Sequence, residues 1–391
     1  MIISKKIKDS IELRFSKIAR KMNSEKKIFY SLGLGEPNFN TPRYIIDSSY
    51  KAMKSGYTKY SSPAGLYELR KLVAKKLIRE NTINAKPEDI IITPGSKMAL
   101  SLALISLIKP YDEIIYFSPS YTSYVPQMLL SESRIVIKKI PLSSKNYQID
   151  FSKLEKKISN KTKAILINFP NNPTGQMIDN NIIKKFEKIL NKYKKCYLIS
   201  DEIYEKLNFS GKKHISPASL KSISKRVITI NGFSKAYAMT GWRIGYCHAN
   251  KSIIKDMIKI QQHINTNVPT FTQMAAVTAY KKKSNHIKLF NSKLLNNFKY
   301  LEKKISKNKS VSLTKSYGGL FVFINIKKTG MNSDKFCSKI LKKYSVAITP
   351  GMYFGEEWKS YIRISLAQNT NVFRKAINLL NIFLNQNYKI S

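Results

Sequence analysis

Residues 231–245 read N-G-F-S-K-A-Y-A-M-T-G-W-R-I-G and place one lysine and one arginine in a glycine-bearing turn. A β-like run at 226–230 leads into this turn, and a second apolar segment follows it. A lysine in such a turn can be desolvated, which lowers the pKa of Lys235 and makes its amine a nucleophile toward carbonyl groups. Arg243, eight residues later, can bind an anion through two parallel hydrogen bonds.

A lysine nucleophile beside a phosphate clamp is what pyridoxal phosphate requires of a protein. An ordinary surface lysine and a structural arginine fit this spacing about equally well. The remainder of the chain therefore has to decide between the two interpretations.

The composition is that of a globular and strongly basic chain. Its 391 residues are 43% hydrophobic and carry a formal net charge of +45. Such a charge raises nucleic acid or an acidic membrane surface as a partner. Most of the basic residues are lysines spread over the expected helices, however, whereas phosphate-reading proteins usually use arginine forks as well. Lys, Asn and Ile share A/T-rich codons, so biased base composition explains the charge. We expect no specific nucleic-acid partner.

The cysteines and histidines show no pattern of a metal site. Cys196, Cys247 and Cys337 lack paired or metal-like spacing, and the four histidines are equally scattered. We therefore predict no bound metal and a reducing compartment, which we take to be the cytoplasm. The longest apolar run, residues 99–108, is about half of what a membrane span needs, so we expect no membrane partner.

Strand-like and helix-like segments alternate over much of the chain. β-like runs fall at 28–34, 90–92, 113–117, 134–140, 164–168, 197–200, 226–230 and 244–247, and helical patterns at 1–27, 42–54, 67–81, 98–108 and 181–193. This alternation predicts an α/β fold with a mostly parallel central sheet flanked by helices. In such folds ligands collect where the carboxyl ends of strands meet loops.

The pattern changes near residue 285. A long lysine-rich helix to about 307 is followed by strand-like runs within 318–326, 346–349 and 362–365, a helix near 334–344 and a terminal helix. We predict a small α+β domain made from an N-terminal segment at 1–45 and from residues 285–391. Residues 46–284 form the predicted large domain.

Polar features fall at the ends of the predicted strands. They are Gly95-Ser96-Lys97, Asn172, Asp201 with Tyr204, Lys235 with Arg243, and Arg363. The first lies between a strand and a helix, where unpaired N–H groups and the helix dipole attract an anion. The others have ordinary alternatives, namely a turn, a helix N-cap, a core side chain and a surface ion pair. A chance convergence of all five is improbable.

The motifs at these places resemble those of the class I and II aminotransferases of pyridoxal-phosphate fold type I. They are G-L-G-E-P-N-F-N-T-P (33–42), T-K-Y-S-S-P-A-G-L-Y-E-L-R (58–70), N-F-P-N-N-P-T-G (168–175), S-D-E-I-Y-E (200–205), the stretch 231–246 and Y-I-R-I-S-L-A (361–367). The resemblance runs from about residue 30 to the end and is closest to bacterial and archaeal aspartate aminotransferases. It implies pyridoxal 5'-phosphate as the cofactor, and a homodimer with active sites at the subunit interface.

The resemblance also implies roles for the residues around the cofactor ring. Lys235 would form a Schiff base with the cofactor and later shuttle a proton. Asp201 would keep the ring nitrogen protonated. Tyr204 and Asn172 would hydrogen-bond the phenolic oxygen, and Tyr121 would stack on the ring.

The implied phosphate and substrate contacts use a second group of residues. The backbone of Gly95, Ser96 and Lys97 would hold the phosphate together with Arg243, joined by Tyr60 of the neighbouring subunit. Arg363 would bind the substrate α-carboxylate, with Asn172, Tyr121 and the backbone of Gly35 beside it. One departure concerns the phosphate, because some relatives have a serine three residues before the lysine, where this chain has Gly232.

Substrate choice is expected to depend on Lys97. Relatives specific for dicarboxylates carry a lysine there, and its charge could pair with the distal carboxylate of aspartate. Alternatively, Lys97 only steadies the phosphate or faces solvent. We predict transamination between aspartate and 2-oxoglutarate by ping-pong half-reactions. Alternative substrates are prephenate, alanine or aromatic amino acids; Lys8 aligns loosely with a lysine that helps some relatives accept prephenate. Alternative functions are a lyase of the same fold and a cofactor-binding regulator.

Overall fold

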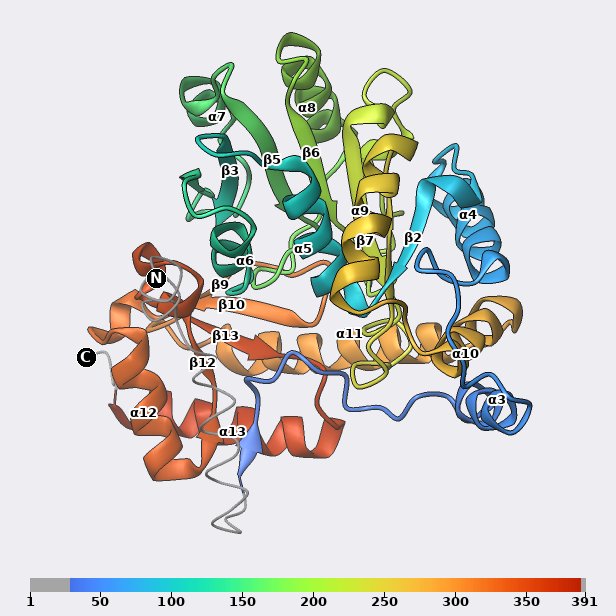
Figure 1. The fold of residues 1–391 in the computed structure, drawn as a ribbon. Coiled ribbons are helices and arrows are strands. Elements are labelled where there is room, and N and C mark those ends of the chain that lie inside the picture. Colours follow the sequence, from blue (N-terminus) through green and yellow to red (C-terminus); the bar gives the residue numbers. More distant parts are fainter. Residues whose placement is uncertain (1–28, 388–391) are drawn as a thin grey trace.

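The computed structural model describes residues 29–387, and its centre is a seven-stranded sheet in the order β2-β8-β7-β6-β5-β3-β4 (Figure 1). The strands are β2 (Ile90–Thr93), β3 (Glu113–Ser118), β4 (Val136–Pro141), β5 (Thr162–Asn168), β6 (Tyr197–Asp201), β7 (Val227–Gly232) and β8 (Gly245–His248). Only β8 runs antiparallel to its neighbours, β2 and β7. The predicted α/β fold with a mostly parallel central sheet is confirmed.

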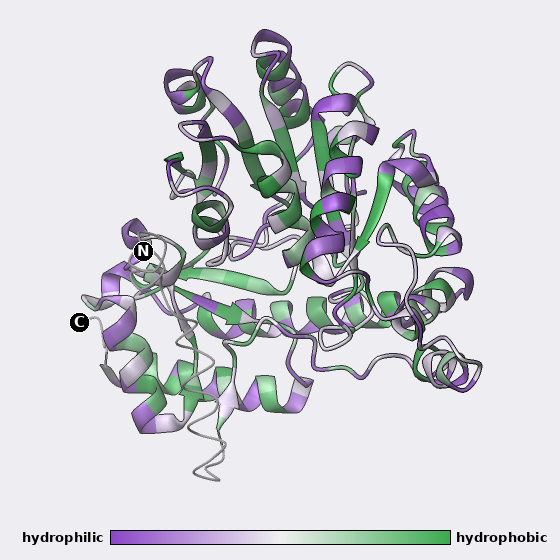
Figure 2. Cartoon of the chain, in the orientation of Figure 1, coloured by the Kyte–Doolittle hydropathy of each residue, from purple (hydrophilic) through white to green (hydrophobic). Residues whose placement is uncertain are grey.

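Successive residues of each central strand enter different hydrophobic cores. Ile90 and Ile92 belong to one core, whereas Ile91 between them belongs to the other. Both faces of the sheet are therefore buried, which explains why these strands are continuous apolar runs rather than alternating ones. Figure 2 shows the strands as hydrophobic and the outer surfaces of the surrounding helices as largely hydrophilic.

Helices cover both faces of this sheet (Figure 1). They are α3 (Arg43–Lys54), α4 (Tyr67–Asn81), α5 (Gly95–Leu107), α6 (Tyr124–Ser131), α7 (Phe151–Lys157), α8 (Asn180–Lys192), α9 (Lys251–Ile264) and α10 (Thr270–Lys281). Helix α5 begins three residues before the predicted run at 98–108, so Ser96 and Lys97 lie in its first turn. Within residues 29–387, no helix combines the length and the apolar content that crossing a bilayer demands.

A smaller antiparallel sheet lies beside the first, in the order β12-β13-β10-β9. Its strands are β9 (Ser312–Leu313), β10 (Phe321–Asn325), β12 (Thr349–Pro350) and β13 (Tyr361–Ser365), and the flanking helices are α11 (His286–Ile305), α12 (Ser333–Tyr344) and α13 (Thr370–Asn387). A third hydrophobic core joins these elements. Short 3-10 helices occur at Pro87–Asp89, Pro217–Ser219, Ser224–Arg226, Lys327–Thr329, Gly351–Phe354 and Glu356–Trp358.

The N-terminal part of the described chain forms a separate two-stranded sheet. β1 (Tyr30–Ser31) pairs in parallel with β11 (Val346–Ala347), and the chain then crosses to α3, which packs on α10 (Figure 1). The predicted boundaries near residues 45 and 284 stay a prediction. The helix expected within 1–27, and Lys8, lie outside the described residues.

Candidate active site

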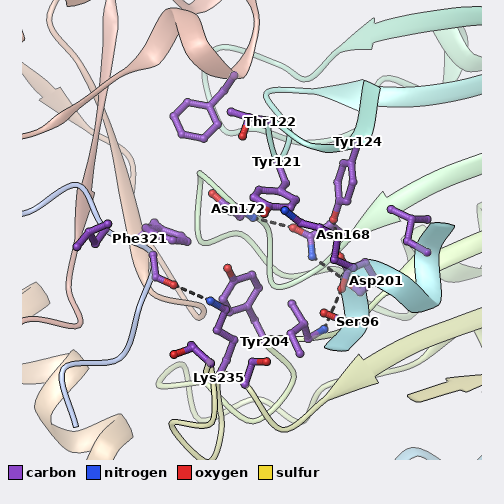
Figure 3. Close-up of a pocket in the computed structure, with 18 of the residues that line it drawn as sticks. Ser96, Tyr121, Thr122, Tyr124, Asn168, Asn172, Asp201, Tyr204, Lys235 and Phe321 are labelled. Carbon is purple, nitrogen blue, oxygen red and sulfur yellow. Dashed lines mark hydrogen bonds between the residues drawn. The ribbon is translucent and has the colours of Figure 1, made fainter. Parts of the chain in front are cut away.

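A cavity of about 520 Å3 lies where the carboxyl ends of β5 and β6 face the smaller sheet (Figure 3). The structure brings most of the predicted site residues to its wall: Gly35, Ser96, Lys97, Tyr121, Asn172, Asp201, Tyr204, Lys235, Arg243 and Arg363. These residues come from segments more than three hundred positions apart in the sequence. Their convergence makes the surface-loop interpretation of Lys235 wrong.

Two predicted residues do not line this cavity. Gly95 lies directly behind Ser96, and a Cβ at Gly95 would come within 2.5 Å of the Arg243 guanidinium, so glycine lets this cation approach the start of α5. Tyr60 is 89% exposed and lies outside the cavity of its own chain. The position of Tyr60 leaves its expected contact with a neighbouring subunit untested.

Lys235 follows β7, and its Nζ donates a 2.6 Å hydrogen bond to the carbonyl of Gly35. Burial lowers the pKa of Lys235 to about 8, while the Glu36 carboxylate acts in the opposite direction. A pKa near neutrality leaves part of the amine unprotonated, which is the form that attacks carbonyl groups. The expectation that the turn activates this lysine is therefore supported by its surroundings.

Asp201 ends β6, and both of its carboxylate oxygens accept hydrogen bonds. Oδ2 accepts from the Tyr124 hydroxyl at 2.7 Å, and Oδ1 accepts from the backbone N–H of Ile203 at 3.2 Å (Figure 3). Burial raises the pKa of Asp201 to about 6, and these hydrogen bonds oppose that rise. The carboxylate is thus held as an anion, and the nearby Lys235 also lowers its pKa without forming a direct ion pair with it.

Asn172 links the large sheet to the substrate side of the cavity. Its backbone N–H donates to Oδ1 of Asn168 at 2.9 Å, and its own Oδ1 accepts from Nη1 of Arg363 at 3.0 Å. Tyr204 is buried beside Asn172, and burial raises the pKa of its hydroxyl. Tyr204 therefore stays protonated at neutral pH and can donate a hydrogen bond into the cavity.

Arg363 lies in the centre of β13 with its guanidinium buried between aromatic rings. The guanidinium carbon is 4.0 Å from the centroid of Phe321 and 4.8 Å from that of Phe354. Nη2 donates to the Gly33 carbonyl at 2.5 Å, whereas Nε is buried without a hydrogen-bond partner among residues 29–387. Burial lowers the pKa of Arg363 to about 10, so it remains a cation. A buried cation with a spare donor is suited to bind a carboxylate.

The start of α5 forms a second anion-binding place. Arg243 donates from Nη1 to the Thr240 carbonyl at 2.8 Å, which fixes its guanidinium near the first turn of the helix. A Cβ at Gly232 would lie 2.9 Å from the Cα of Gly245, so a serine at position 232 is excluded by the backbone. This explains the departure noted in the sequence, and Ser234 lines the cavity instead.

Three contributors were missed by sequence reasoning: Tyr124, Asn168 and Phe354. Tyr124 could have been found from the sequence, because it follows Tyr121 by only three residues. In the structure the two rings meet edge to face, with centroids 5.5 Å apart. Phe354 had none, since its 3-10 helix meets Arg363 only through the tertiary fold.

The sequence model of the family described as "Aminotransferase class I and II" matches residues 27–379. The chain belongs to this family. A Methanocaldococcus jannaschii protein named "(5-formylfuran-3-yl)methyl phosphate transaminase" is 36% identical over 377 residues, covering 94% of this chain and 95% of that protein. The aspartate aminotransferase of Bacillus subtilis is 32% identical over 381 residues, covering 96% of each chain. The solved structure of a protein described as Pyrococcus protein-A1 has a TM-score of 0.93 at 31% identity, covering 98% of this chain and 99% of that one.

This aminotransferase uses amino acids and keto acids as substrates and pyridoxal phosphate as cofactor. The cavity fits that group. The cradle at Gly95, which a Cβ would fill, lies between Arg243 and the start of α5 and could take a phosphate. The anionic Asp201 could face the ring nitrogen, and Lys235 could attach the aldehyde carbon.

Proposed function

We propose that this aminotransferase transfers the amino group of aspartate to 2-oxoglutarate by ping-pong half-reactions. One observation carries the proposal: besides Lys235 and Arg243, two further cations line the same cavity, the buried Arg363 and the exposed Lys97. Arg363 suits the α-carboxylate that every α-amino acid has. Lys97 is then available for the distal carboxylate that distinguishes aspartate and glutamate. The likeness to the Bacillus subtilis aspartate aminotransferase adds support.

The geometry and the charges support the proposed roles around the ring. When bound, pyridoxal phosphate accepts the electron pair released at the substrate Cα. Lys235 holds the cofactor covalently and, once the substrate amine displaces it, takes the proton from Cα. Asp201 keeps the ring nitrogen protonated. Tyr204 and Asn172 hydrogen-bond the phenolic oxygen, and Tyr121 covers the ring.

The proposed anion contacts divide between the two ends of the cavity. The backbone N–H groups of Gly95, Ser96 and Lys97 in the first turn of α5 hold the phosphate together with Arg243, which leaves the Lys97 side chain for the substrate. Arg363 binds the substrate α-carboxylate, and Asn172 and Gly35 lie beside it. The hydrogen bond between Arg363 and Asn172, at 3.0 Å, supports this grouping.

A homodimer with shared active sites is part of the proposal. Tyr60 is far more exposed than a tyrosine normally is, and the exposed apolar side chains Ile46, Tyr50, Met53 and Tyr57 precede it along the chain. Such a patch favours contact with a second subunit. We propose that Tyr60 reaches the cofactor phosphate of that subunit, and that the enzyme works in the cytoplasm without a specific nucleic-acid partner.

A second substrate class is favoured by one feature of the cavity. The Nζ of Lys97 lies 5.6 Å from the centroid of the Tyr121 ring, so a cation and an aromatic face adjoin each other. This pair would also suit a phosphorylated aromatic aldehyde. The Methanocaldococcus jannaschii relative is named for such a compound.

Single-turnover reactions of the purified holoenzyme with aspartate, alanine, tyrosine and a phosphorylated furanyl amine test the proposal through the cofactor's visible absorption. We expect aspartate to react fastest. Lys97→Ser should slow aspartate about tenfold or more while leaving alanine unchanged, because only aspartate has a distal carboxylate to lose its partner. Lys255→Ser on α9, which also removes an exposed lysine, is the matched control. Equal rates for aspartate in Lys97→Ser and the wild type would overturn the assignment.

A further inference from the structure

Residues 33–41, here called the strap, run from β1 to α3 (Figure 1), and the first three of them line the cavity. At one end the Gly33 carbonyl accepts hydrogen bonds from Nη2 of Arg363 at 2.5 Å and from the Thr349 hydroxyl at 3.1 Å. At the other end the Thr41 hydroxyl donates to the Ala238 carbonyl at 2.7 Å. The strap is therefore attached both to the substrate arginine and to the loop that carries Lys235.

The middle of the strap contacts this loop twice. The Gly35 carbonyl accepts the 2.6 Å hydrogen bond from Nζ of Lys235, and Oε1 of the next residue, Glu36, accepts from the Thr240 hydroxyl. A Cβ at Gly35 would lie 2.9 Å from the Phe321 ring, so glycine allows the backbone to come this close. Glu36 is thus fixed one residue away from the carbonyl that Lys235 touches.

Four charged groups influence the Lys235 nitrogen: Glu36 and Asp201 as anions, and Arg243 and Arg363 as cations. Burial is the largest influence and lowers the pKa of Lys235, and the Glu36 carboxylate is the strongest of the groups that raise it again. Without Glu36, Asp201 alone would oppose the two arginines. Glu36 is exposed and is not among the residues that line the cavity, so the strap adds a second negative charge near Lys235 to that of Asp201.

We propose that Glu36 is a positioning residue for the reaction: held by Thr240 beside the Gly35 carbonyl, its carboxylate favours the protonated form of the Lys235 nitrogen once the cofactor is attached. The proposal rests on the proposed attachment of the cofactor to Lys235. It gives a chemical task to the acidic residue of the G-L-G-E-P motif that neither the phosphate nor the substrate contacts explain.

The test is a pH titration of the holoenzyme's visible absorption, which reports the midpoint at which the Lys235 nitrogen loses its proton. Glu36→Gln keeps an acceptor for Thr240 and removes the charge. We expect its midpoint to fall by about half a pKa unit at low salt, a roughly threefold change in the proton equilibrium, and the difference to shrink at high salt. Glu155→Gln removes an exposed carboxylate on α7 and should leave the midpoint unchanged.

Two further variants make the outcome decisive. Thr240→Val keeps the Glu36 carboxylate but removes the hydroxyl that holds it. This variant should therefore shift the midpoint in the same direction as Glu36→Gln, but by less. A larger shift would mean that the Thr240 hydroxyl, not the carboxylate, is responsible, and would refute the proposal. An unmoved midpoint in Glu36→Gln refutes it as well. Borohydride reduction and peptide mapping locate the attached cofactor. If the cofactor were attached to a lysine other than Lys235, both the proposed attachment and the role of Glu36 would be refuted.

Discussion

The hydroxyl of Tyr124 donates a 2.7 Å hydrogen bond to Oδ2 of Asp201, so the first residue of α6 is joined to the last residue of β6. Burial raises the pKa of Tyr124 well above its ordinary value, and the neighbouring Asp201 raises it further. Tyr124 therefore remains a donor at any physiological pH. Tyr124 thus stabilises the Asp201 carboxylate, and Asp201 still lines the cavity, where it can contact a bound group.

Tyr124→Phe should weaken cofactor binding because it removes this donor. Without it, burial raises the pKa of Asp201 above about 6, and less of the carboxylate is ionised to hold the ring nitrogen. A hydrogen bond to a charged group contributes about 1.5–3 kcal/mol, so we expect roughly a tenfold or greater rise in the cofactor dissociation constant. Fluorescence titration of the apoprotein measures it. Tyr197→Phe, at the opposite end of β6, should bind the cofactor as the wild type does.

Phe354→Leu should weaken amino-acid binding while leaving the chemical step intact. The rings of Phe321 and Phe354 hold the Arg363 guanidinium from two sides, at 4.0 and 4.8 Å. Loss of one cation–π contact of about 0.5–2 kcal/mol predicts an increase in KM of roughly 2- to 30-fold with little change in kcat. Phe186→Leu is the matched control, because Phe186 is a buried ring on α8 that packs against Phe117 and Phe151 and does not line the cavity. A fall in kcat with constant KM would contradict this role.

The convergence of Asn172, Asp201 and Lys235 was within reach of the sequence for a physical reason. Parallel strands end at one edge of a sheet, so polar residues that follow β5, β6 and β7 had to meet. Side-chain directions within loops follow no such rule. The contacts of Phe354 with Arg363 and of Glu36 with Thr240 depend on how the smaller sheet and the strap pack, and periodicity does not reveal packing.

Lys76→Met should destabilise the protein, because it leaves a buried carboxylate without its partner. Lys76 on α4 is 4% exposed and pairs with Glu205, which follows β6 and is 8% exposed. Removing one member of a buried ion pair costs about 3–5 kcal/mol of unfolding free energy. Urea denaturation at neutral pH measures the loss. Lys76→Met combined with Glu205→Leu should recover most of it, and a double variant as unstable as the single one would refute the explanation.

The effect of Lys76→Met should also depend on pH. Although burial alone raises the pKa of Glu205, Lys76 and other cations lower it to about 2. A carboxyl whose pKa is depressed on folding stabilises the protein above its unfolded value and loses that contribution as the pH falls toward the folded one. The pair therefore contributes fully above the ordinary glutamate pKa of 4.5 and progressively less between 4.5 and about 2. The difference between the wild type and Lys76→Met should shrink over that interval, and a constant difference would show that Glu205 is not the responsible group.

Mixed dimers test whether the active sites are shared. Lys235→Ala and Tyr60→Ala should each have little activity alone, because one lacks the nucleophile and the other lacks the proposed phosphate contact from the neighbouring subunit. In a hybrid dimer one site carries both defects and the other carries neither, so unfolding and refolding an equal mixture should restore about a quarter of the wild-type activity if subunits pair at random. Refolding each variant alone controls for recovery. If Tyr60 served its own chain, the hybrid would have one defect in each site and activity would not return. The exposure of Tyr60, 89%, favours the first outcome, since a side chain so far from its own cavity has no contact there to lose.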